Sequence, residues 1–237
     1  FGPNIKDWPA MCALTDNLIL KVVSEIHDPV TTTDELIPSG ETSSYRSNPL
    51  RLAEFALSRK DPAYVGNAKA VHAVEVAREQ GEALPDDVNA VYAALTKAGV
   101  ANKPAETVIG STIYANKPGD GSAREQAASC QKVLGGFANI CYSYATKRYR
   151  SNCINWGILP FTIDEGTPFD YADGDCVFVP DVRRAVEEAR EDIPAKVIRK
   201  DGSVEDLMLH IRGLTQDERE IILDGCLMNY YAARIAD

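Results

Sequence analysis

The alternation of strand and helix over residues 106–157 is the feature that most constrains the fold. Residues 106–114 are apolar and β-branched, as in a buried strand, and a glycine-rich turn then leads into a helix predicted over 122–134. A second strand is predicted over 137–142, and a second helix over 145–155. This order is the pattern of βαβ units, whose strands lie parallel in one sheet. The chain is therefore predicted to have an α/β fold.

Further elements and one long loop flank this unit. The expected elements are a strand at 17–26, helices at 50–58, 67–81 and 86–98, a strand at 175–180, a hairpin of strands 195–200 and 203–209, and a final helix at 216–235. Residues 28–49 are dense in Thr, Ser, Pro and Gly, and loops of that length are usually functional or disordered. A length of 237 residues and a hydrophobic content of 45% fit one domain over 1–237, with 1–17 as an irregular lead-in.

Charge and cysteine usage exclude several classes of protein. The formal net charge of −10 makes the chain a poor partner for nucleic acid or an anionic membrane, so neither is expected. No apolar run approaches the roughly 20 residues of a membrane span. The six cysteines form no C-x-x-C pair and mostly sit among apolar residues, which predicts buried, reduced thiols and a cytoplasmic location. The three histidines are scattered, and no metal site is expected in this chain.

The first residue is Phe1 rather than methionine. The simplest explanation is that the 237 residues are a fragment, or a processed or engineered piece, of a longer protein. Part of any active site is then expected to lie outside them.

The turn Gly119-Asp120-Gly121-Ser122-Ala123-Arg124 is the first of two segments with candidate chemistry. Its glycines form a tight turn at the start of the predicted helix, so the amides near Ser122 lack intrahelical partners and attract negative charge. The Ser122 hydroxyl, two residues from the fixed cation of Arg124, is placed to hold a carboxylate or to ionise. The structural alternative is a serine N-cap beside a solvated arginine.

The second segment is Thr32-Thr33-Asp34, within the long loop, with Arg46 twelve residues after the aspartate. Taken alone, these residues fit turn chemistry, in which Thr and Asp side chains bond their own backbone. Their functional interpretation depends on their combination with the glycine turn.

Together the two segments resemble the aconitase superfamily, in its mobile C-terminal swivel domain and in the small subunit of isopropylmalate dehydratases. Members of that family carry an early T-T-D or D-T-D segment, and in aconitases an arginine follows the aspartate of this segment by twelve residues. An apolar strand and the motif G-x-G-S-S-R-E-H-A come next. In order, this chain has Asp34 and Arg46, the turn from Gly119 to Ala127, Leu134-Gly135-Gly136, Ser143-Tyr144-Ala145, Asn152 and Gly157-Ile158-Leu159-Pro160. The resemblance covers residue 18 to the C-terminus. It implies a three-layer β/β/α swivelling domain with a mixed, partly parallel sheet.

The resemblance also implies a catalytic base. Ser122 matches the family's serine, which removes a proton from a carbon next to a carboxylate. A neutral serine is a very weak base, so it needs a helix N-terminus, the amides of Gly121 and Ala123, and a cation such as Arg124. The sequence supplies all of these.

Substrate-binding roles follow from the same resemblance. Arg124 and Arg46 match arginines that bind substrate carboxylates, for which a bidentate guanidinium suits better than lysine. Asp34 matches an active-site aspartate that orients the arginines or the substrate. Thr33 is a further candidate on the same segment.

Several positions depart from the family pattern. Ala123 replaces the second serine of the motif, and Gln126 replaces its histidine. The segment from Gly110 to Ser122 is longer than in aconitases. Ile37 stands where aconitases have a serine, and the sequence leaves open whether Ser39 takes its place. A divergent hydratase therefore fits better than an enzyme acting on citrate or isocitrate.

The cofactor expectation comes from the family as well. Aconitase-type dehydration uses a 4Fe-4S cluster whose open iron is a Lewis acid, held by three cysteines, two of them in C-x-x-C, on another domain. This chain has no such pair. We therefore expect no cofactor in this chain, and a cluster on missing N-terminal domains or on a partner subunit.

The resulting hypothesis is the C-terminal domain of an iron–sulfur-family hydro-lyase, a hydratase or dehydratase acting on a di- or tricarboxylic hydroxy acid. Its partners would be a small carboxylate substrate and the cluster-bearing domains, and the isolated chain would be inactive. The alternative is a catalytically degenerate family member retained as a binding or regulatory module, which the changes at Ala123 and Gln126 motivate. A serine hydrolase is a third option, disfavoured because G-x-S-x-G is absent and no histidine is placed to pair with Ser122.

Overall fold

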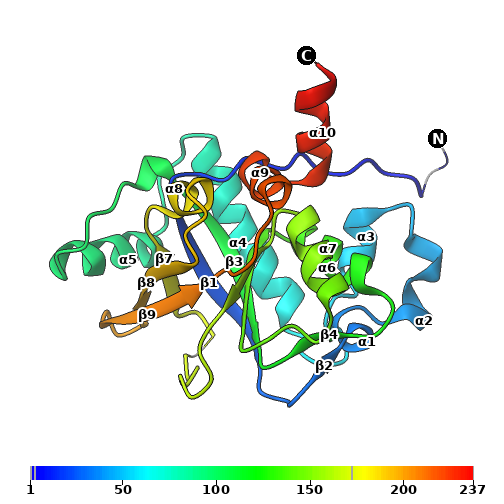
Figure 1. The fold of residues 1–237 in the computed structure, drawn as a ribbon, viewed down its shortest axis with the longest axis horizontal. Helices are drawn as coiled ribbons and strands as arrows, with labels where there is room; N and C mark the ends of the chain where they lie inside the picture. Colours follow the sequence, from blue (N-terminus) through cyan, green and yellow to red (C-terminus); the bar gives the residue numbers. More distant parts are fainter. Residues whose placement is uncertain (1, 3, 172, 237) are drawn as a thin grey trace.

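Seven strands form the centre of the molecule, shown in a computed structural model that describes residues 2, 4–171 and 173–236 (Figure 1). Phe1, Pro3, Ala172 and Asp237 belong to the predicted domain but lie outside the described residues. The strands close into a barrel in the order β1 (Asn17–Ile26), β3 (Thr107–Ala115), β5 (Gly136–Cys141), β6 (Leu159–Thr162), β9 (Val204–His210), β8 (Asp192–Ile198) and β7 (Cys176–Val179). Two short strands, β2 (Thr31–Thr32) and β4 (Pro118–Asp120), pair with each other.

One half of the barrel is parallel and the other is antiparallel. Strands β1, β3, β5 and β6 run parallel to one another, so their carboxyl ends meet at one edge. Strands β7, β8 and β9 are antiparallel, and β7 closes the barrel against β1. The predicted mixed, partly parallel sheet is confirmed. The finer description as three separate layers remains a prediction, because these strands form one closed barrel.

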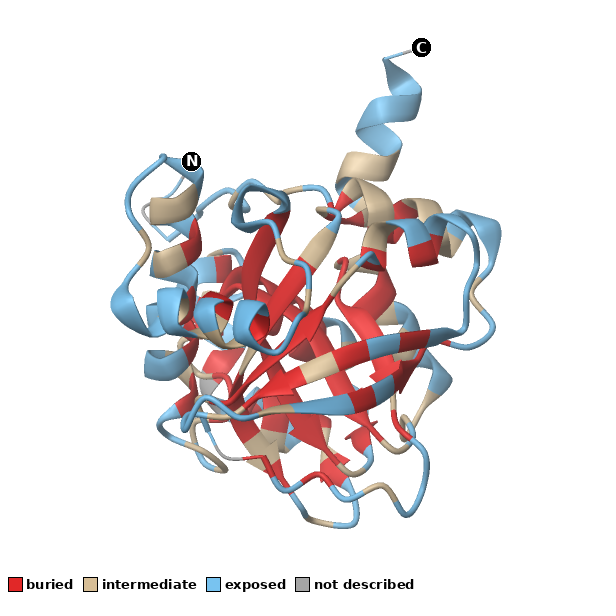
Figure 2. Cartoon of the chain, turned by 90° about the vertical axis from the view of Figure 1, so that its left-hand side faces the viewer, coloured by how far each residue is buried: buried red, intermediate tan, exposed pale blue. Residues whose placement is uncertain are grey.

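Helices and short 3-10 turns lie outside the barrel. They are α1 (Thr33–Leu36), α2 (Ser39–Thr42), the 3-10 turn η1 (Ser43–Tyr45), α3 (Pro49–Ala53), α4 (Tyr64–Glu79), α5 (Asp86–Lys97), the 3-10 turn η2 (Pro104–Glu106), α6 (Arg124–Val133), α7 (Lys147–Asn155), α8 (Val182–Glu187), α9 (Gln216–Asp224) and α10 (Leu227–Ile235). Figure 2 shows mostly buried strands at the centre, helices with exposed outer faces, and α10 standing away from the body. No helix of the described chain is long and apolar enough to cross a membrane.

The alternation along β1 divides the apolar residues into two cores. Leu18, Leu20 and Val22 belong to a cluster with members on all seven barrel strands, which fills the barrel. Ile19 and Val23 point the other way, into a second cluster between the sheet and the helices.

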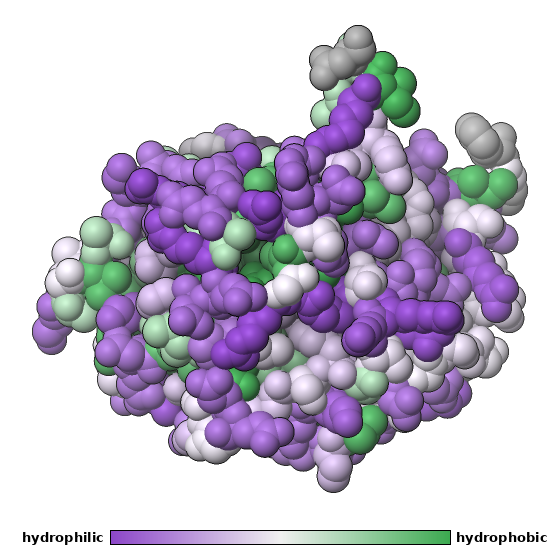
Figure 3. Space-filling view, in the orientation of Figure 1, coloured by the Kyte–Doolittle hydropathy of each residue, from purple (hydrophilic) through white to green (hydrophobic). Residues whose placement is uncertain are grey.

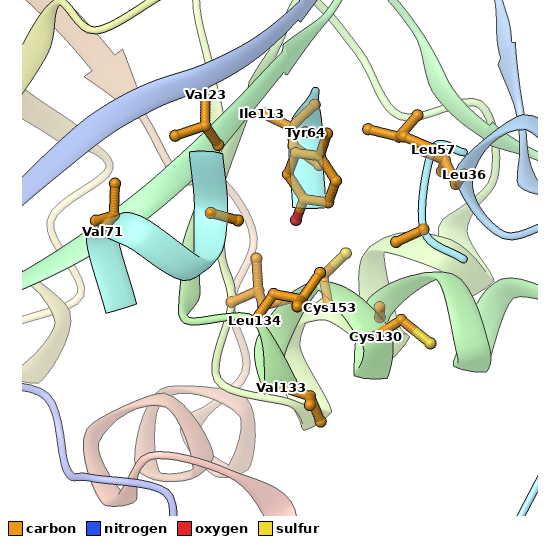
Figure 4. Packing of buried hydrophobic residues seen from close by; sticks show 14 of the residues in the cluster. Val23, Leu36, Leu57, Tyr64, Val71, Ile113, Cys130, Val133, Leu134 and Cys153 are labelled. Carbon is orange, nitrogen blue, oxygen red and sulfur yellow. The ribbon is translucent and has the colours of Figure 1, made fainter. Parts of the chain in front are cut away.

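The second core is arranged around the aromatic ring of Tyr64, which is fully buried. Figure 4 shows this ring near Ile113 of the sheet, with Leu134 and Cys153 beneath it and Leu57 to one side. These contacts pack α4 against the end of α6 and against α7. They therefore fix the position of α6, the helix that follows the glycine turn.

Several predicted boundaries agree with the structure, and some elements differ. The strand at 17–26 is confirmed, and the predicted strands and helices of the βαβ unit are present with ends shifted by one to two residues. The loop at 28–49 contains the short elements α1, α2 and η1, and the helix expected at 50–58 ends at Ala53. Strand β6 and helix α8 were not predicted from the sequence.

The prediction of one final helix over 216–235 is wrong. The chain forms α9 and α10, separated at Gly225, whose φ of 104° is left-handed. The backbone carbonyl of Cys12 lies so close to Gly225 that a side chain there would overlap it. The lead-in, which has neither helix nor strand in its described residues up to 16, therefore packs against this break.

Candidate functional site

The two candidate segments lie side by side at the carboxyl edge of the parallel strands. β2 pairs in parallel with β4, so that Thr31 lies opposite Pro118 and Thr32 opposite Asp120. The Thr31 amide also donates to the Lys117 carbonyl at 2.9 Å. Figure 1 shows β2, β4 and α1 grouped together. In open α/β sheets, ligands bind outside this edge of the strands.

Gly121 allows the two segments to touch. Its φ is 135°, a conformation that side chains rarely adopt, and a Cβ there would overlap the Thr33 hydroxyl. Gly119 has a φ of 102° and lies against the ring of Tyr149 in the same way. Thr33 is itself buried, and its hydroxyl packs against the turn at Gly121. The glycines therefore fit the turn closely between α1 and α7.

Ser122 lies on the exposed side of this turn, directly before helix α6. The helix begins at Arg124 and not at Ser122, and Ala123 is its N-cap. In the described structure, no side chain caps this helix, so the amides of its first turn are open to an external acceptor. The N-cap alternative for Ser122 is thus wrong, and the hydroxyl stands next to the positive end of a ten-residue helix.

Arg124 folds back along the turn. Its Nη1 donates to the Gly121 carbonyl at 2.7 Å, which holds the guanidinium beside the residues that precede it. One Nη donor is used by this bond. The remaining guanidinium donors are what a substrate carboxylate would use.

Asp34 is fixed by the segment that follows it. Its Oδ1 accepts from the Ser39 amide and from the Ser39 hydroxyl, both at 3.1 Å, and the Arg59 guanidinium lies 3.8 Å from Oδ2. These bonds, first the amide and then the hydroxyl, hold the pKa of the Asp34 carboxyl below its usual range. The side chain is 60% exposed, so the ionised group also faces solvent. Ser39 therefore positions Asp34, and whether it takes the place of the aconitase serine stays a prediction.

Arg46 follows η1 and is exposed. Within the described residues it makes no hydrogen bond or ion pair, so the structure does not join it to Asp34 or to the glycine turn. Its role stays a prediction. Arg59, which follows the short helix α3 in a polar stretch, is the cation that the structure places beside Asp34, and the sequence analysis missed it.

A third loop, after β5, supports the turn. The Ala145 amide donates to the Pro118 carbonyl at 2.9 Å, and the Thr146 hydroxyl donates to the Gly119 carbonyl at 3.1 Å. Thr146 is also the N-cap of α7 and accepts from the Tyr149 amide. The sequence signal for this role was a threonine directly before a helix.

The cysteines do not fit an iron–sulfur cluster. Burial raises the pKa of Cys130, Cys153 and Cys176 to about 12 and also raises that of Cys141, whereas a metal ligand must be a thiolate. Across residues 2, 4–171 and 173–236, no three His, Cys, Asp or Glu side chains lie close enough to hold a metal ion.

Comparison with known proteins finds similarity to one family, the aconitases. The profile of the aconitase C-terminal domain matches residues 85–166, which include the glycine turn. Aconitate hydratase A of Bradyrhizobium diazoefficiens is 31% identical over 120 residues, covering 50% of this chain and 13% of that protein. Aconitate hydratase A of Legionella pneumophila is 26% identical over 223 residues, covering 86% of this chain and 24% of that protein. The chain thus spans about a quarter or less of these relatives.

The fold has a counterpart among solved structures. The crystal structure of 3-isopropylmalate dehydratase from Methanocaldococcus jannaschii is similar with a TM-score of 0.54 and 20% identity, over 93% of this chain and 96% of that one. At this identity the likeness concerns the fold alone. The family profile and the aconitate hydratases show that part of this chain is similar to the C-terminal domain of aconitases.

Proposed function

We propose that this domain is part of a larger hydro-lyase that adds or removes water across a carbon–carbon bond of a di- or tricarboxylic hydroxy acid. The observation that carries the proposal is the pairing of β2 with β4, which sets the Asp34 segment against the Ser122 turn. The family resemblance gives these two segments to one active site, and the pairing supports that arrangement.

Ser122 is proposed as the base that removes the proton from the carbon next to a substrate carboxylate. Its exposed position lets it meet a substrate, and the open amides at the start of α6 favour its ionised form. The proton moves from the carbon to the Ser122 oxygen during elimination, and it returns to the carbon during hydration.

Arg124 and Arg46 are proposed to bind substrate carboxylates, and Asp34 to orient a cation or the substrate. Support comes from the anchoring of Arg124 at the turn and of Asp34 by Ser39. Arg46, which lies on the exposed segment after η1, would join the site only when substrate or another domain is present. Thr33, Gly121 and Ala123 would shape the pocket floor.

The rest of the active site is proposed to lie on other domains of the same protein or on a partner chain. The described cysteines do not suit a 4Fe-4S cluster, so the cluster and its chemistry are assigned to those domains. The free thiols support a reducing compartment such as the cytoplasm.

The alternative proposal is a degenerate binding module. Ala123 at the start of α6 offers no hydroxyl where the family pattern has a serine, and this observation favours the alternative. It predicts that the full-length protein binds a hydroxy acid without converting it.

Turnover by the parent protein separates the two proposals. Citrate, isocitrate and 3-isopropylmalate are offered to the full-length protein, loaded with its cofactor, and the alkene product is followed by its ultraviolet absorbance. The hydro-lyase proposal expects turnover of at least one hydroxy acid by the full-length protein and none by the isolated 237 residues. Binding of a hydroxy acid without turnover would support the degenerate module, and turnover by the isolated domain would contradict the need for other domains.

A further inference from the structure

Glu125 lies in the first turn of helix α6, directly after Arg124. A carboxylate at this position is attracted to the free amides of the helix N-terminus, which no side chain caps in the described structure. The same amides and the Arg124 guanidinium are the groups that a substrate carboxylate would use. Glu125 is therefore a potential competitor for the candidate site.

The structure places the Glu125 carboxylate elsewhere. Its Oε1 accepts from the indole Nε1 of Trp156 at 3.1 Å, and within the described residues no other hydrogen bond or ion pair reaches this carboxylate. Trp156 is the C-cap of α7, whose opposite end contacts the glycine turn through Thr146. Lys132, about two helical turns after Glu125, donates to the Gly157 carbonyl at 3.4 Å, so the end of α7 lies beside the later part of α6. The bond from Trp156 thus draws the carboxylate along α6 and away from the turn.

The indole also affects the charge of this carboxyl group. Although Glu125 is exposed, desolvation by the surrounding protein raises its pKa, and the bond from Trp156 opposes this shift because the N–H donor stabilises the ionised form. A carboxylate that lost this donor would gain most from the open amides at the start of its own helix. Trp156 therefore satisfies a group that would otherwise turn toward the candidate site.

The lead-in packs against the Trp156 ring. The ring centroids of Trp8 and Trp156 lie 4.5 Å apart, with the planes tilted by 43°, and aromatic pairs at this spacing are stabilising. The lead-in runs over the surface here, because Ile5 and Trp8 are 44% and 39% exposed. Figure 3 shows apolar atoms at the surface in the region where Figure 1 marks the N-terminus. Trp8 therefore restricts the ring that holds Glu125.

We propose that Trp156 is a positioning residue for the candidate active site, which holds the Glu125 carboxylate away from the start of α6 and leaves the open amides and Arg124 free for a substrate carboxylate. Trp8 keeps the indole in this position. The inference rests on the proposed function, because it assigns the start of α6 to a substrate carboxylate. It explains how an acidic residue in the first turn of α6 can lie beside the site without blocking it.

Isothermal titration of the full-length protein, loaded with its cofactor, with tricarballylate and with succinate tests the inference. Both acids lack an alcohol group and cannot be dehydrated, so binding is measured without turnover. Trp156→Phe keeps an aromatic ring but removes the N–H donor, and should weaken the binding of each acid that the unchanged protein binds by about three- to tenfold. Glu125→Gln removes the competing charge, so the double variant Trp156→Phe/Glu125→Gln should bind as tightly as Glu125→Gln alone. A merely structural role of Trp156 would weaken binding equally in both backgrounds.

Two further variants complete the test. Trp8→Ala keeps the indole donor but removes the ring that packs against it, and should weaken binding by less than Trp156→Phe. It takes the place of Trp156→Phe if circular dichroism shows that variant to be unfolded. Tyr230→Phe is the control, because it removes an aromatic donor to Asp217 in α9, outside the α6 turn, and should leave binding unchanged.

The outcomes for this inference and for the proposed function are distinguishable. The inference is overturned if neither acid binds, if folded Trp156→Phe binds as tightly as the unchanged protein, or if Glu125→Gln does not restore binding in that variant. Turnover of a hydroxy acid that is unaffected by Trp156→Phe would support the hydro-lyase and overturn the inference. Binding that follows the expected pattern without turnover would support the inference together with the degenerate module.

Discussion

At the scale of single residues, Asp34 is the best-defined member of the candidate site. Both of its oxygens have partners, because Oδ1 accepts two bonds from Ser39 and Oδ2 faces Arg59. A carboxylate held in this way is ionised at neutral pH and can orient a cation, but it is not poised to take up a proton. This arrangement fits the orienting role that we propose for Asp34, and it is consistent with the proposal that Ser122 is the base.

Ser39→Ala should raise the pKa of Asp34 toward its usual value. The hydroxyl bond is the second-largest cause of the lowered pKa, and the amide bond remains in the variant. Because the folded pKa is lowered, the carboxylate keeps its bonds through neutral pH and loses them as the pH falls through that lowered value. Carbon-detected NMR titration of the Asp34 carboxyl measures the change.

The chain offers a matched control for this titration. Ser203 donates its amide and hydroxyl to Asp201 in the β8–β9 turn in the same pattern, and the pKa of Asp201 is also lowered. Ser203→Ala should raise the pKa of Asp201 and leave that of Asp34 unchanged. An Asp34 pKa that does not respond to Ser39→Ala would show that the hydroxyl bond is absent in solution.

At the scale of elements, the site depends on three loops that leave the parallel strands at one edge. Strands β2 and β4 hold the first two loops together, and the Thr146 hydroxyl attaches the third. Gly121 packs so closely against Thr33 that a Cβ there would overlap the Thr33 hydroxyl. A side chain at 121 would therefore separate the two candidate segments.

Gly121→Ala should destabilise the domain more than Gly202→Ala. Both glycines have left-handed φ values, 135° and 86°, so each alanine pays about 1–2 kcal/mol of backbone strain. Only at 121 would the new methyl group also overlap the Thr33 hydroxyl, because nothing lies within 4 Å at 202. Overpacking of this kind costs a further 1–3 kcal/mol, roughly.

Urea unfolding of the two variants and of the unchanged domain gives both free energies of unfolding. A larger loss for Gly121→Ala, with the hydro-lyase activity of the parent protein reduced as well, would agree with the observed packing. Equal losses would mean that the turn and α1 are not in contact in solution.

At the scale of the whole molecule, the sequence predicted the elements that carry a strong periodic pattern. The βαβ alternation and the strand at 17–26 were found because long apolar strands and amphipathic helices repeat a signal over many residues. Strands β2 and β4 were missed because two or three residues carry no period. Helices α9 and α10 were predicted as one continuous helix because the apolar pattern continues across Gly225. The break at Gly225 depends on its close packing against the Cys12 carbonyl, which is remote in the sequence and leaves no local signal.

The candidate site was predictable in part. The residues themselves indicated a helix terminus with a hydroxyl and a cation, and the family resemblance brought Asp34 together with Ser122. The contact between Asp34 and Arg59 depends on where the chain turns after α3, which no local pattern encodes. Helix α6 begins at Arg124, two residues later than predicted, because the turn before it continues through the positive-φ glycines Gly119 and Gly121.

The central claim is that Ser122 is the base of a hydro-lyase. Its most direct test is the kcat and KM of the full-length protein with Ser122→Ala, measured on the hydroxy acid that it converts, with Ser203→Ala in the distant β8–β9 turn as the control. The account predicts that kcat falls by about 10² to 10⁴-fold for Ser122→Ala, while KM changes little and Ser203→Ala matches the unchanged protein. A kcat for Ser122→Ala equal to that of the unchanged protein would contradict it.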